Sequence, residues 1–105
     1  MVTVDKIYSS WYEGENPKTI FKRVKVTISS SASTITASDL GFHRITDVQM
    51  LINDAGEGIP YAVDPRERSD QDDAIKRRNR GSNPGTTDSL TSFPVDSYYL
   101  AVKGH

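Results

Sequence analysis

Residues 34–50 read TITASDLGFHRITDVQM and predict a strand, a tight turn and a second strand. The threonines at the start favour a β-strand, because branching at Cβ packs well on a pleated surface. Ser38 and Asp39 can bond nearby backbone N–H groups through their side-chain oxygens, and Gly41 tolerates the positive φ that a chain reversal needs. The stretch therefore predicts a corner in an all-β domain.

The strand that follows this corner extends to residue 53. Val48, Met50 and Ile52 alternate with their odd-numbered neighbours, a period near two that is typical of a β-strand. The pattern predicts that these three side chains share one face.

The same alternation predicts the other strands. Residues 2–12 predict a first strand whose apolar face switches near Asp5, as it does at a β-bulge. In residues 19–29, Ile20, Val24, Val26 and Ile28 are apolar and even-numbered, whereas the odd positions are mostly polar or charged. A short strand around Pro60 belongs at a sheet edge or starts late, because proline cannot donate to a ladder. Residues 95–103 are apolar on both faces, which favours a central strand. Six or so short strands predict a small antiparallel β-sandwich or barrel.

One strongly charged segment interrupts this pattern. Residues 64–80 read DPRERSDQDDAIKRRNR, with acids first and bases last. That order matches the dipole of an α-helix, and Ser69 could cap its start. Because only two residues in the segment's second half are apolar, we expect a short helix within 69–80 or a mobile loop. Together with the polar residues that follow, the segment predicts one long connection between strands, the excursion 64–92. We expect it to become ordered mainly when it contacts a partner.

The composition limits the size of the core. The 105 residues make one domain, 1–105, and 35% of them are hydrophobic. Such a chain has room for about fifteen to twenty buried apolar side chains, which leaves a lone copy marginally stable. We therefore expect it to associate with copies of itself or with a larger surface.

The composition also excludes several classes of function. The chain has no cysteine, which excludes disulfides, thiolate zinc sites and cysteine nucleophiles. Its net charge of −1 provides no field to attract nucleic acid. There is no run of ~18 apolar residues and no signal peptide after Met1, so we expect a protein made in a cytoplasm that does not enter a membrane.

Side chains suited to catalysis or metal binding are few. His43 has Asp39 and Asp47 nearby in the sequence, but no GxSxG motif accompanies them, so a surface histidine is the preferred interpretation. The acids at 70–73 resemble part of a calcium loop but lack its glycine and its distant glutamate. We expect no enzyme activity, no metal and no cofactor.

Two groups of residues are candidates for binding. Tyr8, Trp11 and Tyr12 form an aromatic cluster, which predicts packing in the core or at a subunit interface, with a platform for a sugar as the alternative. The basic run KRRNR at 76–80 could contact phosphates, but the acids before it offset its charge. We therefore expect it to contact protein and not nucleic acid.

Three stretches resemble small structural proteins of tailed-phage heads. They are KRVKVTI at 22–28, TITASDLGFHRI at 34–45 and VDSYYLAVKGH at 95–105. The match at the corner rests on the pattern T-x-x-D-L-G-x-x-x-I, which is carried by Thr36, Asp39, Leu40, Gly41 and Ile45. The match at the end of the chain rests on Ala101 and Gly104. The resemblance covers about 24–52 and 95–104, and the chain departs from the pattern at 64–92.

The resemblance implies a decoration (cement) protein, a β-sandwich that sits as a homotrimer on the major capsid protein and stabilises the shell. It implies a location on the capsid surface of the virion. Under this hypothesis, the residues expected at capsid or subunit interfaces are Tyr8, Trp11, Tyr12, Arg77, Arg78 and Arg80. The alternative is a carbohydrate-binding or other structural module of a phage tail or surface appendage.

Overall fold

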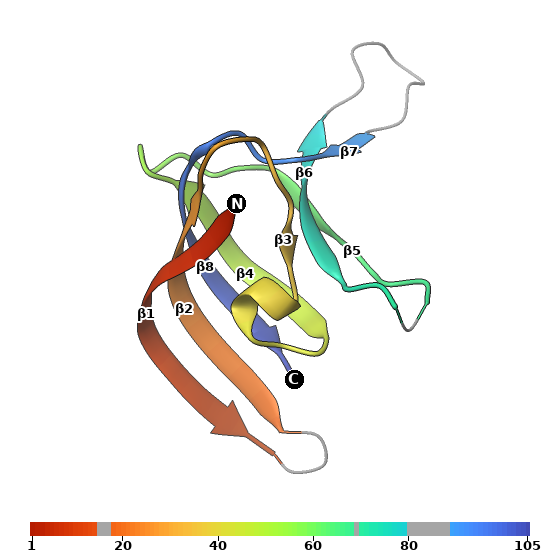
Figure 1. The fold of residues 1–105 in the computed structure, drawn as a ribbon. Coiled ribbons are helices and arrows are strands. Elements are labelled where there is room, and N and C mark those ends of the chain that lie inside the picture. The colour runs from red at the N-terminus through yellow and green to blue at the C-terminus, as the bar shows by residue number, and fades with distance from the viewer. Residues whose placement is uncertain (15–17, 69, 80–88) are drawn as a thin grey trace.

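Two antiparallel sheets pack face to face in the computed structural model, which describes residues 1–14, 18–68, 70–79 and 89–105 (Figure 1). The elements in chain order are β1 (Val2–Glu13), β2 (Thr19–Ile28), β3 (Ile35–Thr36), the 3-10 turn η1 (Ser38–Leu40), β4 (Ile45–Asn53), β5 (Tyr61–Asp64), β6 (Ala74–Asn79), β7 (Ser89–Thr91) and β8 (Asp96–Gly104). The architecture is a small all-β sandwich, as the alternation in the sequence predicts. Among the described residues, no helix is long and apolar enough to span a membrane.

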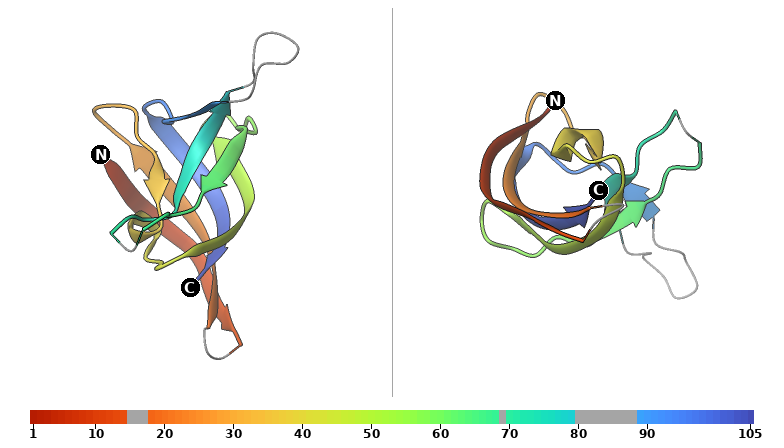
Figure 2. Two further views of the ribbon diagram at one scale, coloured as in Figure 1. Left: turned by 90° about the vertical axis from the view of Figure 1, so that its right-hand side faces the viewer. Right: turned by 90° about the horizontal axis from the view of Figure 1, so that it is seen from below.

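The large sheet has the strand order β1-β2-β8-β4, and the small sheet has the order β3-β6-β5 with β7 also paired to β6. The two views in Figure 2 show the large sheet curving around the core while the small sheet closes the opposite side. β8 lies between β2 and β4, which confirms its predicted central position. β5 follows Pro60 and lies at an edge, which is also as predicted.

The core lies between the sheets and is small. Seventeen hydrophobic residues are buried among those described. The even-numbered positions of β2 (Val24, Val26 and Ile28) face Ile35 and Ile75 of the small sheet across one continuous cluster. Seventeen lies within the range of about fifteen to twenty buried apolar side chains that the composition allows. The domain therefore buries little apolar surface beyond what it needs to stay folded.

The corner at residues 34–50 forms as predicted and carries the chain from one sheet to the other. The backbone N–H of Thr36 donates to Asp39 Oδ2 at 3.0 Å, and the N–H of Gly41 donates to the carbonyl of Ser38 at 3.1 Å. Gly41 has φ +78°, which only glycine adopts at low cost. Because β3 belongs to the small sheet and β4 to the large one, this turn joins the two layers.

Bulges change which residues face the core. The predicted bulge in β1 is present between Val4 and Lys6, and a second one lies between Ile7 and Ser9. β4 has two irregularities as well, which bury Leu51 and leave Met50 39% exposed. The prediction that Met50 shares one face with Val48 is therefore wrong, because each bulge shifts the alternation by one residue.

The predicted helix within 69–80 is wrong, because residues 74–79 form strand β6. The first residues of β6 are buried, and Ile75 is 0% exposed in the centre of the core. Lys76 bonds Asp64 on the neighbouring strand at 2.6 Å, so it makes its ion pair across the sheet and not along a helix. The excursion 64–92 thus contributes β6 and β7 to the small sheet, while Ser69 and Arg80 lie outside the described residues.

Candidate interaction surface

Strand β1 exposes four large apolar or aromatic side chains within six residues. Ile7 is 52% exposed, Tyr8 51%, Trp11 43% and Tyr12 64%. β1 is the edge strand of the large sheet, and its hairpin with β2 extends beyond the small sheet (Figure 2), so little of the molecule covers these residues. Side chains of this size on one exposed strand are typical of a surface that binds a partner.

The two faces of the hairpin carry different members of this group. Trp11 pairs with Phe21 and stacks on it, with ring centroids 5.1 Å apart and planes 2° from parallel. Both rings lie on the outer face, the side of the large sheet that faces away from the small sheet. Tyr12 pairs with Ile20, which belongs to the even-numbered, core-side positions of β2. The predicted aromatic cluster is therefore divided between the faces, and none of its three members is buried.

Tyr8 extends the outer face toward the middle of the sheet. Its ring centroid lies 6.5 Å from that of Tyr99 on β8. An apolar groove of about 370 Å³, here called the outer groove, lies between these rings. The residues that line it are Tyr8, Arg23, Val24, Met50, Tyr99 and Leu100.

Lysine ammonium groups lie over the rings of the outer face. Lys6 Nζ is 4.9 Å from the centroid of Tyr8, Lys25 Nζ is 5.8 Å from that of Tyr99, and Lys103 Nζ is 5.7 Å from that of Phe21. Such contacts are weakly attractive and hold the long side chains against the sheet. None of these lysines lies within ion-pair distance of a carboxylate of the described residues, whose ion pairs are Arg44–Asp73, Arg68–Asp70 and Lys76–Asp64.

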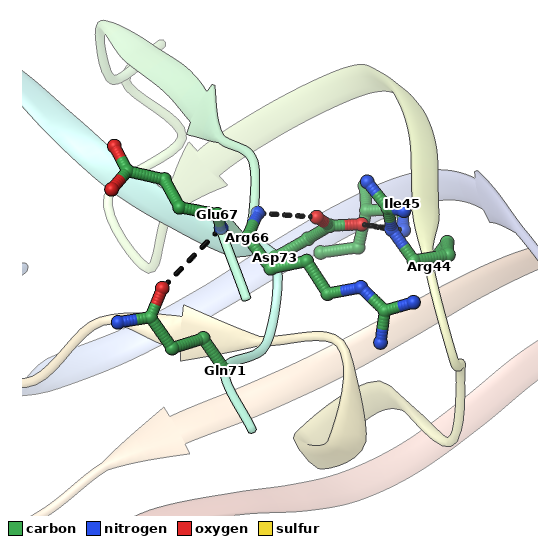
Figure 3. A network of polar contacts seen from close by, with 6 residues as sticks. All are labelled: Arg44, Ile45, Arg66, Glu67, Gln71 and Asp73. Carbon is green, nitrogen blue, oxygen red and sulfur yellow. Dashed lines mark hydrogen bonds and ion pairs between the residues drawn. The ribbon is translucent and has the colours of Figure 1, made fainter. Parts of the chain in front are cut away.

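A second, polar groove of about 520 Å³ lies beside the small sheet. Its lining includes Thr36, Glu67 and Gln71 and the ion pair between Lys76 and Asp64. The carbonyl oxygen of the Gln71 side chain accepts a bond from the N–H of Glu67 at 3.3 Å (Figure 3). Because several of its polar groups already bond one another, we interpret this groove as part of the scaffold.

Asp73 anchors the segment that borders this second groove. Its side chain is 1% exposed and accepts bonds from Arg44 Nε at 2.7 Å, from the N–H of Ile45 at 2.9 Å and from the N–H of Arg66 at 2.8 Å (Figure 3). Burial raises the pKa of Asp73, but these three bonds outweigh it and hold the pKa at about 2. The carboxylate is therefore charged, and its three hydrogen bonds connect the loop before β6 to the start of β4.

The basic residues expected at an interface do not lie with the aromatic ones. Arg77 and Arg78 are on β6, where they pair with Thr91 and Leu90 of β7. Arg77 is half-buried and Arg78 is exposed, while Arg80 lies outside the described residues. The cations that do accompany Tyr8 and Trp11 come from β1, β2 and β8. Lys25 and Lys103 could be found in the sequence at odd-numbered positions of 19–29 and 95–103, opposite the core face, whereas the alternation in β1 does not mark Lys6.

The other candidate residues form no reactive group within the described part of the chain. The backbone N–H of His43 donates to the carbonyl of His105 at 2.7 Å, and no hydrogen bond joins its side chain to Asp39 or Asp47. In the same residues, no three His, Cys, Asp or Glu side chains are grouped to hold a metal ion. What the structure assembles is an exposed aromatic and cationic face.

No family model, no curated protein and no solved structure matches this chain.

Proposed function

We propose that this chain is a structural protein of a tailed-phage virion, which binds the outside of the major capsid protein shell and stabilises the head. The observation that carries the proposal is the outer face, where the exposed rings of Tyr8 and Trp11 lie among cations. Tyrosine, tryptophan and arginine are the side chains that dominate protein–protein interfaces. The resemblance of the corner at 34–45 to head proteins supports the choice of partner.

The small core supports a role that depends on association. A domain with seventeen buried hydrophobic residues among those described gains stability by covering the exposed part of β1. The proposal includes a homotrimer, in which copies act together and many weak contacts add through their high effective concentration on the shell. The protein is made in the host cytoplasm and ends on the capsid surface, with no catalytic role, cofactor, membrane or nucleic acid partner.

Co-sedimentation tests the proposal. The full chain is mixed with heads of the phage that encodes it, assembled without it, and the particles are pelleted. We expect the chain to pellet in a fixed ratio to capsid protein and to raise the temperature at which heads lose their DNA. A chain that stays in the supernatant at saturating concentration contradicts the proposal.

A sugar-binding module of a phage tail or appendage is the second candidate. The exposed ring of Trp11, already stacked on Phe21, offers the flat surface that sugar rings pack against. A glycan array distinguishes the two, because a head protein binds none of the sugars. Selective binding to one class of glycan, lost in Trp11→Ala, would favour the sugar-binding module.

A further inference from the structure

The outer groove has a composition that specifies the chemistry of its partner. We propose that it binds a segment of the major capsid protein that carries an apolar side chain flanked by carboxylates. This inference rests on the proposed function and adds to it the surface that meets the shell and the chemistry that it recognises.

The floor of the groove requires an apolar group. Met50 is 39% exposed and Tyr8 51% exposed, and the ring of Tyr99 closes the side toward β8. A volume of about 370 Å³ accommodates a side chain with its flanking backbone. Filling it would remove exposed apolar surface from water, which is the main favourable contribution at the centre of an interface.

The rim of the groove requires negative charge. Arg23 lines the groove and is exposed, and Lys6 and Lys25 lie over the two tyrosine rings beside it. No described carboxylate lies within ion-pair distance of these three side chains. Contact with the rings restricts the lysines before binding, so less side-chain freedom is lost when a carboxylate arrives.

Two acids make hydrogen bonds with residues of the large sheet. Asp5 accepts a hydrogen bond from Thr27 Oγ1, and Asp54 accepts one from the hydroxyl of Tyr99 at 3.3 Å. Neither of these carboxylates forms an ion pair with Lys6, Arg23 or Lys25, so the rim cations remain available for carboxylates from outside.

Charge also argues against two other occupants. A two-fold axis beside Arg23 would bring Arg23 of one copy against Arg23 of another, and like charges in contact destabilise an interface, which argues against a symmetric dimer through the groove. Nucleic acid needs an extended positive field, whereas this chain has a net charge of −1. A protein segment with its own carboxylates satisfies both the apolar floor and the cationic rim.

Lysine labelling on the particle tests which surface is covered. The full chain, free or bound to heads assembled without it, is treated briefly with an acetylating reagent and digested for mass spectrometry. We expect the labelling of Lys6 and Lys25 to fall at least about fivefold on binding, as for surface buried in an interface. Lys76 is the control, because it lies on the small sheet and pairs with Asp64.

Charge reversal tests the chemistry. The double variant Arg23→Glu with Lys25→Glu should bind heads at least about tenfold more weakly than the native chain, because it sets like charges against the partner. The double variant Arg66→Glu with Arg68→Glu is the matched control, since both arginines are exposed and lie between β5 and β6, away from the large sheet. It should bind as the native chain does. Circular dichroism establishes that both variants fold.

The outcomes separate the two proposals. If the native chain does not pellet with heads, the proposed function fails and this inference fails with it. If it pellets but Lys6 and Lys25 label as in the free chain, or if the variant Arg23→Glu with Lys25→Glu binds normally, only the inference is overturned. Protection of Lys6 and Lys25 in the free chain, either by self-association or by added oligothymidine, would assign the groove to another occupant and overturn the inference too.

Discussion

Asp73 shows how one residue can decide the arrangement of a small sheet. Its carboxylate accepts bonds from three separate residues, and its own carbonyl accepts the N–H of Ala37 at 2.9 Å. It therefore connects β6 with both ends of the corner at 34–50. An acid in a run of acids gives no sign of this in the sequence, where Asp70, Asp72 and Asp73 look alike.

Asp73→Asn should destabilise the fold by about 2–3 kcal/mol at pH 7, because an amide cannot accept all three bonds and Arg44 loses its charged partner. Urea unfolding followed by circular dichroism measures the change. Asp70→Asn is the control: Asp70 is 73% exposed in its pair with Arg68, and its loss should change stability by less than about 0.5 kcal/mol. Equal effects of the two variants would contradict the role given to Asp73.

The same carboxylate predicts a dependence on pH. Its pKa is lowered from 3.8 to about 2 in the folded state, so its contribution is present above pH 4 and is lost as the pH falls toward 2. A shift of this size corresponds to about 2 kcal/mol. The difference in unfolding free energy between the native chain and Asp73→Asn should therefore shrink between pH 4 and pH 2. A difference that is constant across this range would show that the carboxylate's charge is not involved.

Gly104 is a position where any side chain should be harmful. A Cβ there would collide with the carbonyl oxygen of Arg44 and come within 2.9 Å of the ring of Phe42. Gly104→Ala should lower stability by about 1–3 kcal/mol, as overpacking of a core does. Gly58→Ala is the control, since a Cβ at Gly58 meets nothing within 4 Å. Thermal melts of the two variants should differ by several degrees, and indistinguishable melts would contradict the packing described at Gly104.

At the scale of elements, the sequence predicts β1, β2, β4 and β8, but not every bulge and not β6. β2 and β8 pair without a register shift, and both lie where the sequence predicts strands. A switch of the apolar face marks the bulge of β1 near Asp5. No such switch marks the bulges of β4, so the sequence does not show that they reverse which residues are buried. The charges of β6 follow the order that suits a helix dipole, and they therefore predict a helix. In the structure, burial of Ile75 decides the outcome.

Hydrogen exchange distinguishes a hydrogen-bonded strand at residues 74–79 from an unpaired loop and tests the strand order. β8 is bonded on both sides and should exchange most slowly, whereas the outward-facing amides of the edge strand β1 should exchange fastest. The amides of β6 are paired with strands on both sides and should also be protected. Rapid exchange throughout residues 74–79 would contradict the strand assigned there.

At the scale of the whole molecule, the two sheets have different roles. The small sheet and the corner complete the core and are held by Asp73, while the large sheet keeps its outer face exposed. Sequence reasoning found Tyr8 and Trp11 but not the residues that complete the face, because β1, β2, β4 and β8 come together only in the folded sheet. The exposed strand and the small core lead to the same expectation, that this protein works in an assembly.

Under the proposed function, an electron cryo-microscopy reconstruction of the encoding phage tests that expectation most directly. We expect the β-sandwich to lie on the outside of the capsid shell, with the outer face of the large sheet against the capsid protein. A head without this density, or the chain located in the tail, would contradict it.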